Sequence, residues 1–250
     1  MKKHLNKKTT IILGLCFVIV AGSIAGFVIW RTQDRVQAEF NIHINQTAIY
    51  LSTYSEPPQF AIWLENPQNG QCQQVFVTYR VSRGYWEGKS DVPVALPRWK
   101  TVFRDGGAQT VRSDEEIAVS GATPRDEYFR VRAEIQPGSE WICWVEMNLA
   151  GDFNEFYPQF NQLTFQEDEF ACGQPALLYR AKIKAEEGLK YTPEIAFMSL
   201  WEEGNVNRLV PLDETITTAH EVFDEISIVM IKPKPVIFNK YRIGKQDVLK

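Results

Sequence analysis

The sequence has few of the residues on which common enzyme chemistry depends. It contains three histidines and four cysteines in 250 residues. Downstream of His220-Glu221, Asp224 occupies the position where a zincin helix needs its second histidine, so that metalloprotease motif is absent. A nucleophile elbow, a glycine-rich phosphate loop and a Cys-x-x-Cys pair are also missing. We therefore expect a protein that is not an enzyme and has no metal site.

The few cysteines leave the disulfide pattern open. Cys16 lies in a long apolar run, and three cysteines follow it: Cys72, Cys143 and Cys172. An oxidising compartment would allow one disulfide among these three, and their spacing does not identify the pair. Cys143 with Cys172 is the favoured pair, and buried free thiols are the alternative.

Positive charge is scarce in the central part of the chain. Residues 36–231 carry 15 Lys/Arg and 29 Asp/Glu, whereas the tail, residues 236–250, is basic. A strongly acidic domain repels the phosphate backbone, so nucleic acid is not an expected partner. A basic protein or a cation remains compatible with this charge.

Charged residues are absent from residues 11–30, a stretch about as long as the 20 residues that an α-helix needs to cross a bilayer. Four lysines precede this stretch, which predicts a cytoplasmic segment over residues 1–10, a tether over 31–39 and an extracytoplasmic remainder. Val36-Gln37-Ala38 resembles a signal-peptidase site. The apolar run is longer than the about 7 to 15 residues of a cleaved signal, which favours an uncleaved anchor. We expect a single-pass protein of the bacterial inner membrane with most of the chain in the periplasm.

The rest of the chain shows the two-residue period of β-strands. Phe129, Val131, Ala133 and Ile135 alternate with polar residues, and a Pro-Gly turn and a second apolar run follow, so residues 127–147 are predicted to form a β-hairpin. Residues 60–79 form a second predicted hairpin with an Asn-Gly turn. Further strands are expected at 40–44, 177–183, 195–201 and 226–231, and a short helix at 217–225. The pattern predicts an all-β sandwich protein with one β-sandwich over residues 40–165 and a second β module over 166–235.

Aromatic residues are frequent in the loop-rich segment 80–107. Three of them are candidates for a recognition surface: Tyr85, Trp86 and Trp99. Aromatic side chains in a long loop either cover a core or bind a partner, and both interpretations stay open. Asp152, Asn154 and Glu155 suggest a calcium loop, but the EF-hand pattern is absent, so a solvated turn is the expected structure.

Ser120-Gly121-Ala122-Thr123 resembles the Ser/Thr-Gly-Ala-Thr motif of FMN-binding domains in bacterial membrane redox systems. The resemblance implies covalent attachment of FMN to Thr123 through a phosphoester, with Ser120 beside it. Ile117 occupies the place where the motif usually has Asp, and Pro124-Arg125 replace polar residues. The alternative interpretation is a tight turn that precedes an edge hairpin.

A broader similarity covers most of the ectodomain. It is carried by residues 60–65, Asn69-Gly70, residues 96–99 and residues 120–135. These segments resemble an uncharacterised family of bacterial periplasmic proteins whose sandwich is similar to the immunoglobulin-like domain of the flagellar hook-capping scaffold. The resemblance implies an Ig-like β-sandwich and an association with flavin transferases and membrane reductases. The expected function is a non-catalytic accessory or scaffold of a flavin-dependent membrane redox system. The alternative is a recognition module for an envelope protein, peptide or glycan.

Overall fold

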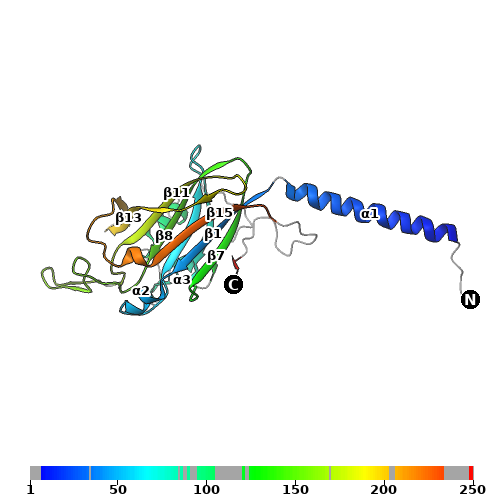
Figure 1. Cartoon of the computed structure of the whole chain (residues 1–250). Helices are drawn as coiled ribbons and strands as arrows, with labels where there is room; N and C mark the ends of the chain where they lie inside the picture. Colours follow the sequence, from blue (N-terminus) through cyan, green and yellow to red (C-terminus); the bar gives the residue numbers. More distant parts are fainter. Residues whose placement is uncertain are drawn as a thin grey trace, which may run out of the picture.

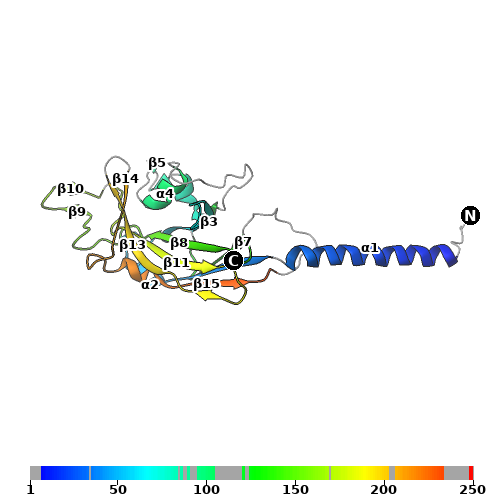
Figure 2. The ribbon, with the colours of Figure 1, turned by 90° about the horizontal axis from the view of Figure 1, so that it is seen from above.

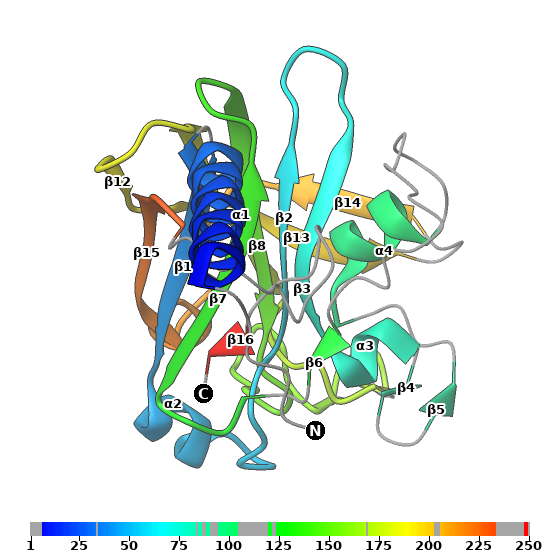
Figure 3. The same cartoon turned by 90° about the vertical axis from the view of Figure 1, so that its right-hand side faces the viewer.

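The computed structural model describes residues 7–33, 35–83, 85–86, 89–90, 95–104, 120–121, 124–168, 170–202, 206–233 and 248–249. Within these residues the chain forms two facing β-sheets, with β15 and β1 on one side and β2 and β3 on the other (Figure 3). The five-stranded sheet has the order β12 (Lys190–Tyr191), β15 (Phe223–Ile231), β1 (Val36–Ile44), β7 (Tyr128–Ile135) and β16 (Val248–Leu249). The seven-stranded sheet has the order β14 (Val206–Val210), β13 (Glu194–Glu202), β11 (Ala176–Lys184), β8 (Glu140–Asn148), β2 (Gln59–Glu65), β3 (Cys72–Thr78) and β6 (Ser120–Gly121).

The main core fills the space between the two sheets. Every second residue of β1 is buried, from Val36 to Ile44, as expected for a strand with one face inside. Aromatic rings join the layers: Phe129 of the five-stranded sheet lies 5.0 Å from Phe60 and 4.6 Å from Phe76, measured between ring centroids. The sandwich is thus held together by apolar contact between the sheets.

A second apolar cluster lies on the outer face of the seven-stranded sheet. Helix α4 (Pro97–Phe103) covers this face (Figure 2) and contributes Trp99 and Val102 to the cluster, which also contains Trp63. Neither α4 nor two shorter helices, α2 (Gln46–Leu51) and α3 (Tyr79–Arg83), were predicted from the sequence. Local periodicity cannot reveal them, because each has fewer than two full turns of sequence.

The predicted hairpin over residues 127–147 is wrong. β7 pairs with β1 and β8 pairs with β2 and β11, so the turn at Pro137-Gly138 carries the chain from one sheet to the other. The predicted boundary between two β modules near residue 166 is wrong as well, because β11 joins β8 and β15 joins β1 in the same two sheets. Residues 36–231 therefore share one core.

The remaining expectations agree with the structure only in part. β2 and β3 form the predicted hairpin over residues 60–79, and a 3-10 turn, η1 (Ala219–Glu221), lies within the helical segment expected at 217–225. β1 begins at Val36, so the tether predicted for residues 31–39 is shorter than expected. The structure describes all four cysteines and contains no disulfide among them; the favoured bond between Cys143 and Cys172 does not form.

A long helix, α1 (Lys7–Gln33), extends away from the sandwich (Figure 1). Its described apolar side chains are exposed, including Phe17 at 76% and Val18 at 67%. Among the described residues, no helix is both long enough and apolar enough to span a membrane.

Candidate functional site

The candidate site is an open pocket of about 720 Å³ at one end of the sandwich. It is lined by Gln46, Ile49, Ser55, Glu56, Pro57, Gln59, Tyr79, Arg80 and Arg125. These residues come from α2, the loop after it, the start of β2, α3 and the segment before β7. The volume lies within the range of about 300 to 1,000 Å³ that is typical of sites for small molecules and cofactors.

Two arginines give the pocket a positive side. The guanidinium of Arg80 forms an ion pair with the carboxylate of Glu56. Arg125 is exposed and has no ion pair with another described residue. A guanidinium presents a planar set of donors that suits a phosphate or carboxylate. The pocket therefore favours a ligand with an apolar body, which can contact Ile49 and Pro57, and an anionic group.

The pocket adjoins the segment that resembles an FMN-attachment motif. The backbone of Ser120 and Gly121 forms β6, which pairs in parallel with Val77 and Thr78 at the edge of the seven-stranded sheet. Tyr79 and Arg80, which directly follow Thr78, line the pocket, and so does Arg125, two residues after Thr123. Thr123 lies outside the described residues. Ser120-Gly121 forms an edge strand, and the tight turn that the alternative interpretation expects over Ser120–Pro124 includes residues 122 and 123, which lie outside the described residues.

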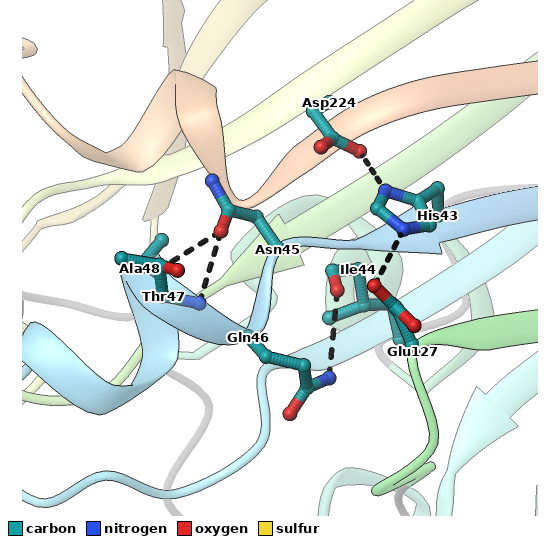
Figure 4. A network of polar contacts seen from close by, with 8 residues as sticks. All are labelled: His43, Ile44, Asn45, Gln46, Thr47, Ala48, Glu127 and Asp224. Carbon is teal, nitrogen blue, oxygen red and sulfur yellow. Dashed lines mark hydrogen bonds and ion pairs between the residues drawn. The ribbon is translucent and has the colours of Figure 1, made fainter.

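A polar network centred on His43 lies at the end of β1 that leads into α2 (Figure 4). His43 lies at the end of β1, where Nδ1 is 2.5 Å from Oδ1 of Asp224 and Nε2 is 3.2 Å from Oε1 of Glu127. The hydrogen bond with Asp224, followed by the one with Glu127, raises the pKa of His43. Two carboxylates favour the protonated imidazole, which connects β15, β1 and the segment that carries Arg125.

Asn45 then directs the chain into α2. Its side-chain oxygen accepts the backbone N–H groups of Thr47 at 3.0 Å and Ala48 at 3.2 Å, which makes it the N-cap of the helix (Figure 4). The N–H of Asn45 itself donates to the carbonyl of Val222 at 2.9 Å. The cap fixes the start of the helix that supplies Gln46 and Ile49 to the pocket.

The three aromatic residues proposed for recognition do not form one exposed surface. Trp99 is 4% exposed, and its indole N–H donates to Oε1 of Gln74 at 2.8 Å, so this ring belongs to the packing of α4 on the sheet. Tyr85 and Trp86 form the short strand β4, which pairs with β5 (Lys89–Ser90). Trp99 therefore supports the packing interpretation of its segment.

A buried carboxyl group holds α4 in place, and the sequence analysis did not identify it. Glu146 of β8 is fully buried and accepts the N–H groups of Arg98 at 2.9 Å and Trp99 at 2.7 Å. Burial raises its pKa from 4.5 to about 7, against the hydrogen bonds from Ser199 and the two amides. The sequence does carry a signal for a buried acid here, because Glu146 lies within an apolar strand, between Val145 and Met147.

The acidic loop after β8 serves a structural role. Asp152 is 5% exposed and accepts the backbone N–H of Gln174 at 2.9 Å, and burial raises its pKa to about 8. Asn154 accepts the N–H groups of Phe156 and Tyr157, and Glu155 is exposed. In the described part of the chain, no cluster of His, Cys, Asp and Glu has the arrangement of a metal site.

In comparisons with known proteins, no family model, curated protein or solved structure matches this chain.

Proposed function

We propose that this chain is a membrane-anchored, extracytoplasmic and non-catalytic Ig-like β-sandwich that acts as an accessory of a flavin-dependent membrane redox system. The observation that carries the proposal is the position of the pocket. Its lining includes Tyr79, which directly follows the strand paired with Ser120-Gly121, and Arg125, which lies two residues after Thr123. The resemblance of this motif to FMN-attachment sites supplies the chemistry. The pocket would supply a place for the ring system beside Arg125, which follows the proposed acceptor Thr123 by two residues in the sequence.

The residues of the pocket fit a flavin mononucleotide. Arg125 offers the phosphate a cation that forms no ion pair with the other described residues, while Ile49, Pro57 and Tyr79 offer surface to the ring. Gln46 can donate to a carbonyl oxygen of the ring through its amide. FMN would supply electron transfer, and the residues of this chain would bind and orient it.

The anchor is proposed from the sequence of α1. Residues 11–30 contain no charged side chain, and at about 1.5 Å per residue they extend about 30 Å, the thickness of a hydrocarbon core. Helix α1 extends away from the sandwich (Figure 1), and its described apolar side chains are exposed. A bilayer would cover them, and the chain would lie in the bacterial inner membrane with its sandwich in the periplasm.

The test is coexpression of the full chain with a bacterial flavin transferase, followed by intact mass measurement and in-gel flavin fluorescence. We expect a mass increase of one FMN that Thr123→Ala abolishes and that Thr192→Ala, a change of an exposed threonine in the β12–β13 connection, leaves intact. Arg125→Glu should lower the yield of the adduct. An unmodified wild-type chain would refute flavin attachment.

A further inference from the structure

A protruding hairpin lies at the opposite end of the sandwich from α1. It consists of β9 (Phe160–Asn161) and β10 (Gln166–Glu167), and it is the outermost element at that end in Figure 2. Four large apolar side chains are exposed on it and on the loop that leads to it: Phe156 at 48%, Phe160 at 51%, Leu163 at 91% and Phe165 at 79%. So dense a group of exposed apolar side chains is unusual on a folded domain and marks contact surfaces.

The hairpin is ordered by its own hydrogen bonds. The side-chain oxygen of Asn161 accepts the N–H groups of Leu163 at 2.9 Å and Thr164 at 3.1 Å, and its carbonyl accepts the N–H of Phe165 at 2.8 Å. At the base, Oδ2 of Asp168 accepts the N–H of Gly173 at 2.8 Å. The backbone that carries the apolar side chains is therefore held in one conformation, which reduces the entropy that binding would cost.

Phe165 adopts a backbone conformation that does not suit it. Its φ is +56°, in the left-handed region, which a bulky residue rarely occupies. The ring gains no burial in return, since it is 79% exposed. Asn or Asp would fit this backbone better, so the presence of Phe is not explained by the stability of the hairpin. Strained backbone conformations of this kind are found mainly at functional sites.

The charge of the hairpin and its loop limits the kinds of partner that it can bind. The sequence has no Lys, Arg or His from Leu149 to Tyr179, whereas Glu167 is exposed on β10 and Glu155 is exposed on the loop that leads to the hairpin. An anionic lipid surface would repel these carboxylates, and so would a second copy of the same hairpin. A protein pocket with an apolar floor and Lys/Arg at its rim is complementary to both features.

We propose that the β9–β10 hairpin is a docking element that inserts Leu163 and Phe165 into an apolar pocket with a basic rim on an envelope protein. Glu155 and Glu167 pair with the rim, where they speed the encounter and fix the orientation. This inference does not depend on flavin binding, since the pocket near Arg125 is made by other residues.

The test is photo-crosslinking of the full chain in the membranes of its native host, with Gln162→p-benzoylphenylalanine, a change of an exposed polar residue beside Leu163, as the probe and mass spectrometry to identify the crosslinked peptide. We expect one partner protein, with the crosslink in an apolar segment next to Lys or Arg. Phe165→Asn in the same chain should lower the yield at least about tenfold, the loss typical of an anchor at the centre of an interface. It should leave thermal stability unchanged or higher, because Asn relieves the strained φ.

Two controls separate specific docking from nonspecific apolar adhesion. Leu189→Asp, a change of an exposed leucine in the β11–β12 connection, should leave the yield unchanged. The double charge reversal Glu155→Lys and Glu167→Lys should lower it. A crosslink to lipid, a crosslink to a second copy of the chain, or no crosslink would overturn the proposal. So would a yield that Phe165→Asn does not change.

Discussion

The side chain of Glu146 accepts the backbone N–H of Trp99 at 2.7 Å, across 47 residues of sequence. The same carboxyl group accepts the N–H of Arg98 at 2.9 Å, so it satisfies two amides in the first turn of α4, which has no side-chain cap of its own. Burial of this acid would be unfavourable without these donors. These two hydrogen bonds explain how α4, which lies in an otherwise irregular segment, is held on the outer face of the seven-stranded sheet.

Removal of this carboxyl group should destabilise the fold. Glu146→Ala leaves two buried N–H groups without acceptors, and we expect a loss of about 3 kcal/mol in the free energy of unfolding. Glu146→Gln keeps one acceptor and should lose less, about 1 to 2 kcal/mol. Denaturant unfolding of the purified chain at pH 7 measures both. Equal stability of Glu146→Ala and the wild type would contradict the role given to Glu146.

The pH dependence of stability should follow the two buried carboxyl groups. Burial raises the pKa of Glu146 from 4.5 to about 7 and that of Asp152 from 3.8 to about 8. Each group binds its proton more tightly in the folded state, so its contribution is complete below the unfolded pKa and is lost as pH rises through the folded pKa. We expect the thermal midpoint to fall between pH 5 and pH 8, and to fall less in Glu146→Gln. A midpoint that rises over this range would contradict the prediction.

His43 should contribute to stability in the same direction. Its pKa is raised by the hydrogen bonds to Asp224 and Glu127, so the protonated ring stabilises the network below pH 6.5 and this contribution is lost as pH rises through the folded pKa. NMR titration of the imidazole should give a pKa above 6.5 that Asp224→Asn lowers. An unshifted His43 would show that the ion pairs do not persist in solution.

The cap of α2 offers a test of how the pocket is built. Asn45→Ala removes the acceptor for the N–H groups of Thr47 and Ala48 and should cost about 1 kcal/mol. Asn45→Asp keeps the acceptor and should be close to neutral. Hydrogen exchange of the Thr47 and Ala48 amides should accelerate only in Asn45→Ala. Protection unchanged in that variant would mean that the helix start is fixed by other contacts.

The proposed membrane anchor predicts where the chain fractionates. The full chain should stay in the membrane pellet after alkaline carbonate extraction, because a helix that spans the bilayer is not released by charge. Ile19→Arg with Val20→Arg should release it, since each arginine at the centre of a span costs about 2.5 to 3.5 kcal/mol. Replacement of the same residues by Leu is the control. A wild-type chain that carbonate extracts would rule out the anchor.

The alternation in β1 and β7 was a reliable guide because a strand with one buried face repeats every two residues wherever it lies. The partner of each strand was not available from the same pattern. Pro137-Gly138 looks like a hairpin turn in the sequence, and only the tertiary structure shows that it joins strands in different sheets. The sites were harder to predict than the strands, because their residues come together only after the sheets have formed. Glu146 then accepts the N–H of Trp99, and Tyr79 and Arg125 line the same pocket.

The sequence by itself determined the uncharged stretch before the domain, the β class of the rest and the positions of most long strands. These properties depend on the order of apolar and polar residues along a short segment. The tertiary structure decided that the two halves share one core, that Trp99 is buried and that the hairpin tip at Leu163 is exposed. Each of these depends on contacts between residues far apart in the chain, and such contacts leave no periodic signal in the sequence.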